Sequence, residues 1–436
     1  KSHLFTEKLV VYQPLAETEQ RKTEAQSSIQ TTVAKELKWV SAHIAKQDIV
    51  ITTALQKFQR NPLTFQSKDI IATRDYDVIL TAHVKAIEVG SGKVLLDQMA
   101  SQSARLRRDF KLDLRVRGLL SSKRMLLSDK GVDLSQWQSE FAAADRPADL
   151  AAFVEHVGVD YLPHRVIIDC TASGEVAKHY ADWLAAGIHI VTPNKKANSA
   201  PLESYRALHQ ARRLGGTHYL YEATVGAGLP VVQTLRDLRE TGDEITSIEG
   251  IFSGTLAYLF NVYDGSREFS DIVVEAKQRG YTEPDPRDDL SGTDVARKLI
   301  ILGREMGLDL EMSDVQVESL VPAGLEQGSI DDFLQRLPQH DAAMKGRFER
   351  ATAAGKVLRY VGRLTADGKA TVGVVELERK HPFANIALTD NVVRFATSRY
   401  NNNPLIVQGP GAGPEVTAGG IFADLLRLSA YLGARL

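Results

Sequence analysis

The sequence predicts an α/β protein in which a doubly wound parallel sheet precedes a second, α+β region. From about residue 102, short apolar segments alternate with segments of helical length, which is typical of a parallel sheet covered by helices. After Gly242 the pattern changes to strands joined by turns, including the strong hairpin signal Asp367-Gly368. A chain of 436 residues is long enough for about three domains or subdomains.

Four strands are expected in the first region and five in the second, the fifth being Pro404–Gln408. Ser173 is placed to begin a helix that ends at Gly187, and a second helix ends at Gly215-Gly216. The last helix of the chain is expected over Ile421–Leu432. The expected strands are Leu112–Leu119, Val166–Cys170, Ile188–Thr192, His218–Thr224, Thr246–Phe252, the hairpin Lys356–Leu364 with Ala370–Leu377, and Asn391–Ser398.

The composition is that of an ordinary globular protein, with 43% hydrophobic residues, 25% charged residues and a net charge of -2. Such a charge gives no reason to expect nucleic acid or an anionic membrane as a partner. No apolar run reaches the roughly eighteen residues needed to span a membrane. The single cysteine, Cys170, excludes an intramolecular disulfide and fits a reducing compartment. We therefore expect a cytoplasmic protein with no membrane partner.

Residues 1–100 leave two interpretations open. Val84–Val89 is rich in β-forming residues and is followed by Gly90-Ser-Gly-Lys and the apolar Val94-Leu-Leu. This pattern fits a hairpin with a glycine turn, and it also fits the first strand and loop of a nucleotide-binding unit. A P-loop is excluded, because Gly-Ser-Gly-Lys lacks the required spacing and the following Ser or Thr.

The segment 280–298 concentrates the groups most suited to chemistry. It contains four carboxylates and two prolines, which restrict its backbone, and it leads into a helix. Asp294 and Lys298 lie four positions apart on one face of that helix. On spacing alone, an ordinary ion pair on a surface helix is an equally good interpretation.

Five segments together carry a specific resemblance. From about residue 102 to the end, the chain resembles homoserine dehydrogenase, and in particular the dehydrogenase part of the bifunctional aspartokinase–homoserine dehydrogenases. No aspartokinase motif is present before residue 100. The matching segments are TPNKKAN at 192–198, YEATVGAGLPV at 221–231, FSGTLAYLF at 252–260, GYTEPDPRDDLSGTDVARKL at 280–299 and GPGAGPEVTAGG at 409–420.

The resemblance implies a fold, a reaction and an assembly. The expected reaction is the NAD(P)H-dependent reduction of L-aspartate 4-semialdehyde, a small molecule, to L-homoserine in threonine and methionine biosynthesis. The expected fold is a Rossmann-like dinucleotide-binding domain at 101–240, completed by 410–436, with a substrate and dimerisation domain at 241–409. Residues 1–100 form a segment of uncertain origin, which either stands apart or supplies the first strand. A homo-oligomer, a dimer or larger, is expected.

The resemblance also assigns catalytic and substrate-binding residues. Hydride addition to an aldehyde leaves an alkoxide that needs a proton or a nearby positive charge. Lys298 resembles the general acid of the family, and Lys195 resembles its second active-site lysine, with a solvated lysine at a strand end as the alternative for Lys195. The remaining residues expected to bind substrate are Glu283, Asp294, Asp289 and Gly280.

The cofactor site departs from the family pattern at its first loop. Gly90 and Gly92 match the first two glycines of G-x-G-x-x-G, but the third is absent, although it serves close helix–strand packing. The alternative function is therefore a catalytically impaired relative that acts as a binding or regulatory protein. Thr171 and Ser173 follow a strand and are expected near the cofactor together with Lys195. Gly411 resembles the late glycine loop of the family.

The loop after the strand Leu112–Leu119 bears on the choice of cofactor. An NAD enzyme usually places an acidic residue there for the ribose hydroxyl, whereas this chain has Ser121, Lys123 and Arg124. Hydroxyls and cations suit a 2′-phosphate, so NADP(H) is favoured over NAD(H). A solvated basic loop is an equally good alternative.

Glu222, Val225, Ala227 and Leu229 resemble the monovalent-cation site of the family. A glycine-rich turn exposes backbone carbonyls there, and one carboxylate balances the charge. Such hard oxygen ligands suit an alkali cation such as sodium rather than zinc. The alternative is a plain strand–turn–helix with glycines for close packing.

Overall fold

The computed structural model describes residues 78–85, 90–159, 162, 164–386 and 388–436, and over 78–85 it describes the backbone alone. Most of the region left open by the sequence, residues 1–77, lies outside the described residues. Tyr76–Leu436 form one compact unit, which contains every described residue.

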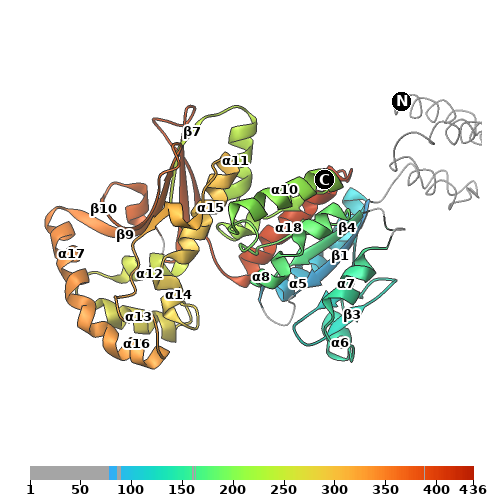
Figure 1. Ribbon diagram of the computed structural model, residues 1–436, viewed down its shortest axis with the longest axis horizontal. Helices are drawn as coiled ribbons and strands as arrows, with labels where there is room; N and C mark the ends of the chain where they lie inside the picture. Colours follow the sequence, from blue (N-terminus) through green and yellow to red (C-terminus); the bar gives the residue numbers. More distant parts are fainter. Residues whose placement is uncertain (1–77, 86–89, 160–161, 163, 387) are drawn as a thin grey trace, which may run out of the picture. The chain divides into compact units, whose positions relative to one another are not determined.

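The first sheet has six strands and is parallel except at one edge (Figure 1). Its strands are β1 (Val78–Lys85), β2 (Leu112–Leu120), β3 (Met125–Leu127), β4 (His164–Asp169), β5 (His189–Val191) and β6 (Tyr219–Leu220). The order is β3-β2-β1-β4-β5-β6, and only the edge strand β3 runs antiparallel to its neighbour. The order reverses between β1 and β4, the kind of position where open α/β sheets bind ligands. The predicted Rossmann-like fold is confirmed.

The hairpin interpretation of residues 84–96 is wrong. The strand β1 is followed by the helix α5 (Ser91–Phe110), which contains the apolar run at 94–96. Leu95 and Leu96 are fully buried, and Met99 and Leu106 continue the same buried side of the helix. The short stretch that suggested a hairpin could not show this helical period, which becomes visible only over the next ten residues.

Helices cover the first sheet, and the C-terminal helix is among them. They are α5, α6 (Trp137–Ala142), α7 (Leu150–Val157), α8 (Gly174–Ala177), α9 (Tyr180–Ala185), α10 (Leu202–Gly215) and α18 (Pro414–Tyr431). Helix α18 packs against α5 although the two are far apart in sequence. The single helix expected over 173–187 is in fact the pair α8 and α9. The strand expected over 218–224 is shorter, because it ends in the 3₁₀ turn η2 (Glu222–Thr224).

The second sheet also has six strands and is antiparallel except for one pair. Its strands are β7 (Ile245–Ile251), β8 (Val315–Val317), β9 (Lys356–Thr365), β10 (Ala370–Glu378), β11 (Asp390–Thr397) and β12 (Leu405–Pro410). The order is β12-β11-β7-β9-β10-β8, with β8 and β10 parallel. The predicted hairpin at Asp367-Gly368 joins β9 to β10, and Gly368 has a φ of 85°, which glycine adopts without strain.

The helices of the second region join the two sheets and cover the second one. Helix α15 packs against β9 of the second sheet and against α11. The helices are α11 (Val231–Glu240), α12 (Gly254–Val262), α13 (Phe269–Gln278), α14 (Pro286–Leu290), α15 (Thr293–Met306), α16 (Ile330–Arg336) and α17 (Asp341–Ala353). Short 3₁₀ turns lie at η3 (Met312–Asp314), η4 (Leu337–His340) and η5 (Pro382–Asn385).

Candidate active site

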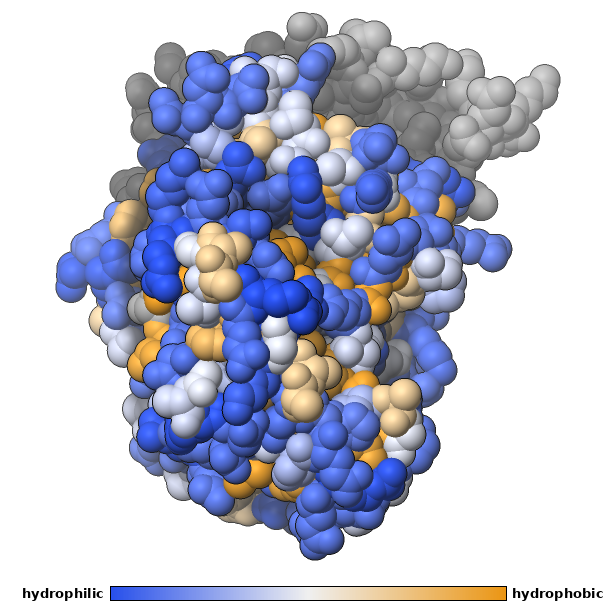
Figure 2. Space-filling model, turned by 90° about the vertical axis from the view of Figure 1, so that its left-hand side faces the viewer, coloured by the Kyte–Doolittle hydropathy of each residue, from blue (hydrophilic) through white to orange (hydrophobic). Residues whose placement is uncertain are grey.

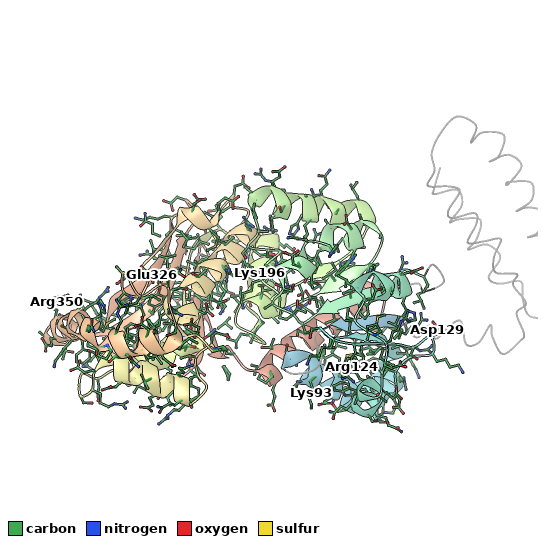
Figure 3. The ribbon with its side chains drawn as sticks, turned by 60° about the horizontal axis from the view of Figure 1, so that its bottom comes forward. Lys93, Arg124, Asp129, Lys196, Glu326 and Arg350 are labelled. Atoms are coloured by element: carbon green, nitrogen blue, oxygen red, sulfur yellow. The ribbon has the colours of Figure 1, made fainter. Side chains whose placement is uncertain are left out.

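Asp294 joins the two predicted catalytic lysines. Its Oδ2 atom lies 2.8 Å from Lys298 Nζ, and its Oδ1 atom lies 3.3 Å from Lys195 Nζ. Asp294 and Lys298 lie one turn apart in α15, whereas Lys195 follows β5 of the first sheet. Lys298 is only 7% exposed, so the pair is not an ordinary ion pair on the surface. Figure 3 labels the next residue, Lys196, between the elements of the two sheets.

The electrostatics of this cluster favour an acid–base role. Burial lowers the pKa of Lys298, and the Lys195 ammonium acts in the same direction, while Asp294 opposes the shift. Burial acts to raise the pKa of Asp294, but the two lysine charges outweigh it and hold that pKa below its ordinary value. Asp294 therefore stays ionised beside a buried lysine that gives up its proton more readily than a lysine in water.

A backbone carbonyl fixes the ammonium of Lys298 from a third direction. Lys298 Nζ donates to the carbonyl oxygen of Phe252, 2.5 Å away, at the point where β7 leads into α12. An ammonium has three N–H donors. Asp294 and Phe252 occupy two of them and leave one for a substrate oxygen.

The acidic segment before α15 is held by its own hydrogen bonds. The Oδ2 atom of Asp289 accepts from the backbone N–H of Glu283, 2.8 Å away, and the side chain of Glu283 is exposed. Burial raises the pKa of Asp289 to about 6. Gly280 follows α13 with a φ of 70°, in the left-handed conformation that ends many helices. Asp285 caps α14 and binds the Arg287 guanidinium, so it stabilises the turn before that helix.

Thr171 and Ser173 lie in the loop after β4, beside the segment that carries Lys195. The backbone N–H of Thr171 donates to buried Asp169, and the Ser173 hydroxyl caps α8. Asn194, which directly precedes Lys195, donates to Ser173 O at 2.9 Å and to Asp169 Oδ2 at 3.1 Å. The two loops are thus bonded to one another at the carboxyl edge of the parallel strands, where α/β sheets bind ligands.

The start of α5 fits a pyrophosphate. Gly90 caps the helix with a φ of 80°, Gly92 is buried in the first turn, and that turn contains no acidic side chain. The N–H groups at such a helix start favour an anion. Leu95 replaces the third glycine and is fully buried in the core. The preceding residues 86–89 lie outside the described part of the chain, and no observation supports an impaired glycine loop.

The loop after β2 is less open than its composition indicates. The Ser121 hydroxyl accepts from the backbone N–H groups of Lys123 and Arg124 and so closes a turn. The Arg124 guanidinium donates to the Ala142 carbonyl at 2.7 Å. Lys123 is exposed. Of the three predicted residues, Lys123 has the side chain best placed to meet a ligand from solvent.

The four residues of the predicted cation site lie in one turn between η2 and α11. The Glu222 carboxylate is buried and accepts from the N–H groups of Val232 and Gln233, so it caps α11. Burial and the nearby Asp424 raise the pKa of Glu222 to about 7. Ala227 has a φ of 53°, unusual for a residue other than glycine. Val225 and Leu229 complete the turn. The described residues contain no group of three or more His, Cys, Asp or Glu arranged for a metal.

Comparison with known proteins decides the family. The family model described as "Homoserine dehydrogenase" matches residues 230–426, and the model "Homoserine dehydrogenase, NAD binding domain" matches residues 88–222. A homoserine dehydrogenase of Schizosaccharomyces pombe is 44% identical over 313 residues, covering 70% of this chain and 82% of that protein. The chain belongs to the homoserine dehydrogenase family. It therefore has the NAD(P)-binding domain of these oxidoreductases.

Two further relatives extend the comparison. The chloroplastic bifunctional aspartokinase/homoserine dehydrogenase 1 of Zea mays is 57% identical over 348 residues, which cover 79% of this chain but 38% of that protein. The chain thus corresponds to less than half of the length of this bifunctional relative. A crystal structure of a putative homoserine dehydrogenase from Archaeoglobus fulgidus superposes with a TM-score of 0.66 at 25% identity, covering 80% of this chain and 99% of that one.

Sequence reasoning missed two polar residues of this homoserine dehydrogenase site. Thr255, in the first turn of α12, donates to the Tyr281 carbonyl at 2.6 Å and so fastens the acidic segment. Its place after the helix-starting Ser253 was a usable signal. Asn391 of β11 donates to the same Phe252 carbonyl as Lys298. No local pattern marks Asn391, since its partners are distant in sequence.

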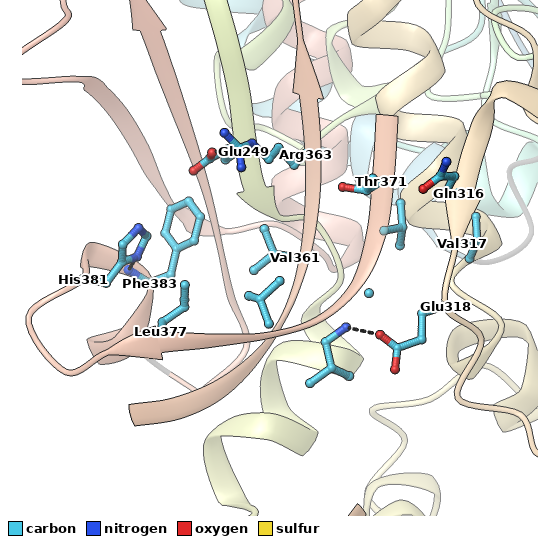
Figure 4. A pocket seen from close by; sticks show the side chains of 14 residues that line it. Glu249, Gln316, Val317, Glu318, Val361, Arg363, Thr371, Leu377, His381 and Phe383 are labelled. Carbon is cyan, nitrogen blue, oxygen red and sulfur yellow. Dashed lines mark hydrogen bonds and ion pairs between the residues drawn. The ribbon is translucent and has the colours of Figure 1, made fainter. Parts of the chain in front are cut away.

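A groove of about 600 Å³ lies on the second sheet, away from these catalytic residues (Figure 4). Val361, Val375 and Leu377 line its floor, and Glu249 pairs with Arg363 at its edge. Figure 2, which faces the β10 and α17 end of the homoserine dehydrogenase, shows apolar residues exposed among hydrophilic ones. None of the predicted site residues lines the groove.

Proposed function

We propose that this chain catalyses the NAD(P)H-dependent reduction of L-aspartate 4-semialdehyde to L-homoserine. The observation that carries the proposal is the placement of Asp294 between Lys298 and Lys195. The proposal concerns the dehydrogenase reaction alone, since the chain spans only 38% of the bifunctional maize relative. The product places the reaction in threonine and methionine biosynthesis.

Each residue of the cluster has a part in the reduction. The bound nicotinamide supplies a hydride to the aldehyde carbon. Lys298 gives its proton to the oxygen, which would otherwise become an alkoxide, and burial makes this lysine a stronger acid than one in water. Lys195 supplies a second positive charge, and Asp294 holds both ammonium groups in place.

The acidic segment binds the amino-acid end of the substrate. The substrate carries an α-ammonium, which the carboxylates of Glu283 and Asp289 attract. The turn at Gly280 and the bond from Thr255 to Tyr281 fix the segment that presents them. Because Asp289 has a pKa of about 6, it is ionised at neutral pH and able to pair with the ammonium.

The cofactor is held by Gly90, Gly92, Thr171, Ser173 and Gly411, and NADP(H) is preferred to NAD(H). No acidic residue follows β2, where NAD enzymes usually bind the ribose hydroxyl. The exposed ammonium of Lys123 suits a 2′-phosphate instead. Ser121 and Arg124 support that loop through their own bonds.

A sodium ion is proposed at the turn formed by Glu222, Val225, Ala227 and Leu229. A buried carboxylate with a pKa of about 7 gains from a nearby cation, which would keep it ionised. A thermal unfolding series in sodium chloride and in choline chloride tests the site. Equal midpoints in the two salts would count against it.

Two copies of the chain are proposed to pair through the groove of the second sheet. Its apolar floor is bordered by Glu249 and Arg363. In a two-fold contact, Glu249 of one copy would face Arg363 of the other, and their opposite charges suit such a pairing. Sedimentation of the wild type and of Val375→Glu tests the assembly. A monomer in both samples would exclude it.

The cytoplasm is the proposed compartment, and the support for this proposal is that the chain has a single cysteine. Cys170 is the only cysteine of the chain, and burial raises the pKa of its thiol. A reducing compartment suits such a chain. No helix of the described residues is long and apolar enough to cross a membrane.

The reaction is tested by following NADPH consumption with L-aspartate 4-semialdehyde. The expected result is steady turnover, with slower turnover when NADH replaces NADPH. The sample is first shown to be folded by circular dichroism. A folded sample without turnover at saturating substrate would overturn the proposal.

A further inference from the structure

The amide of Asn391 and the ammonium of Lys298 meet on one oxygen atom. Asn391 lies in β11 and is fully buried. Its Nδ2 atom donates to the Phe252 carbonyl at 3.2 Å, and Lys298 Nζ donates to the same oxygen at 2.5 Å. When Lys298 has lost its proton, the neutral amine binds the Phe252 carbonyl more weakly, but the Asn391 amide still donates to that oxygen.

Asn391 also explains why position 411 is a glycine. A Cβ atom at Gly411 would lie 2.0 Å from Asn391 Cγ and 2.1 Å from its Nδ2 atom. These distances are far inside contact distance, so the backbone at 411 passes directly over the amide. Gly411 belongs to the segment that leads into α18 and that is proposed to contact the cofactor. A shift of this segment would therefore press on Asn391.

The orientation of the amide follows from its surroundings. The opposite orientation would place the amide oxygen against the Phe252 carbonyl, and two acceptors repel each other. The Oδ1 atom of Asn391 is buried and has no hydrogen-bond partner among the described residues. A buried acceptor without a partner lowers stability. Asn391 therefore contributes less to the stability of the fold than an apolar side chain could.

We propose that Asn391 is a positioning residue for Lys298 and couples it to the segment around Gly411. This inference rests on the proposed function. Asn391 fixes the Phe252 carbonyl, the carbonyl fixes Lys298 Nζ, and Gly411 holds the amide in place. The charged groups that face Lys298 are Asp294 of its own helix, Lys195 after β5 and Asp289 of α14.

The first test measures kinetics and pH dependence in two variants. Asn391→Ala should lower kcat about tenfold or more and leave the KM for NADPH within about twofold. Asn391→Asp removes the amide donor from the Phe252 carbonyl and replaces it by a carboxylate, whose negative charge near the ammonium should raise the pKa of Lys298. A general acid must be protonated, so the pH at which kcat falls should move upward. An unchanged kcat in the first variant or an unchanged profile in the second would overturn the proposal.

The control for these variants is Asn385→Ala. Asn385 also donates its amide to a backbone carbonyl, that of Arg379 at 2.9 Å, but it is exposed and distant in the chain from Lys298. Its kcat should stay within about twofold of the wild type. An equal loss in the control would show that the effect of Asn391→Ala is not specific.

The second test needs neither cofactor nor turnover. Gly411→Ala should lower the thermal midpoint, and adding Asn391→Ala should recover much of the loss because it frees the space that the new methyl requires. Additive losses would show that the two positions do not press on each other. The pKa of Lys298, followed by NMR in the free wild type and in Asn391→Asp, completes the test. A wild type without turnover would overturn only the proposed reaction, because the thermal midpoints and the pKa of Lys298 do not depend on turnover.

Discussion

The guanidinium of Arg304 donates to the carbonyl oxygen of Asn198, 2.8 Å away, across the junction between α15 and the loop that carries Lys195. The same guanidinium donates to Ala200 O at 2.7 Å and to Leu310 O at 2.8 Å, and Arg304 is only 4% exposed. One buried side chain thus binds three backbone carbonyls in two segments, the loop at 198–200 and Leu310. The helix that carries Lys298 is thereby fastened to the loop that carries Lys195.

Replacing Arg304 by Leu should destabilise the protein strongly. Two buried carbonyls and one partly buried carbonyl would lose their donor, and each unpaired buried group costs about 1–3 kcal/mol. We expect the free energy of unfolding to fall by about 2–4 kcal/mol in a urea titration. Arg350, exposed on α17 and labelled in Figure 3, supplies the control. If Arg350→Leu lowered the free energy of unfolding as much as Arg304→Leu, the hydrogen bonds of Arg304 to the three carbonyls would not be the cause of the loss.

Replacing Lys298 by Ala should remove most of the activity and little of the cofactor affinity. General acid catalysis contributes about 10²–10⁴-fold, so kcat should fall by that order. The Kd of NADPH, measured by fluorescence titration, should stay within about threefold. Lys196→Ala is the matched control, since Lys196 adjoins Lys195 but has no ion pair in the described structure. Parallel losses of kcat and affinity would contradict the role of Lys298.

Asp289 should make the protein less stable as the pH rises. Its pKa is about 6 in the folded chain, above the ordinary 3.8, so the folded state binds more protons than the unfolded state in between. The contribution of this group is therefore fully present below pH 3.8 and is lost as the pH rises through 6. The free energy of unfolding of the wild type, minus that of Asp289→Asn, should be larger below pH 3.8 than above pH 6. A constant difference would show that burial does not shift this carboxyl.

Lys123→Ala should weaken NADPH binding more than NADH binding. The lysine is expected to meet only the 2′-phosphate, so the ratio of the two Kd values should change by about tenfold. Lys130→Ala, an exposed lysine beyond β3, should leave the ratio unchanged. Equal losses for the two cofactors after Lys123→Ala would assign the loop a structural role.

The sequence predicted the elements that have a long period or a strong turn signal. The hairpin at Gly368 and the apolar strand at 166–170 were recognisable because their patterns are local. The sequence around β1 and α5 is ambiguous, since the helical period of α5 begins only beyond Gly92. The sequence predicts one helix where α8 and α9 form two, because an interruption by two turn residues leaves the hydrophobic period intact.

The catalytic cluster was predictable only in part, for a physical reason. Asp294 and Lys298 share a helix face, so spacing alone joins them. Lys195 was assigned from a motif, and its contact with Asp294 depends on how two sheets meet. Asn391 could not have been found, since its role depends on the Phe252 carbonyl and on an absent methyl at Gly411.

Helix α15 has a consequence for motion in this protein. Near its start Asp294 holds Lys195, and near its end Arg304 holds the carbonyls at 198 and 200 while Glu305 pairs with Arg236 of α11. A hinge-bending rotation between the two sheets would have to break several of these bonds at once unless its axis ran along the helix. We therefore expect α15 to be the pivot of any domain closure, so that the two lysines keep their separation during the movement.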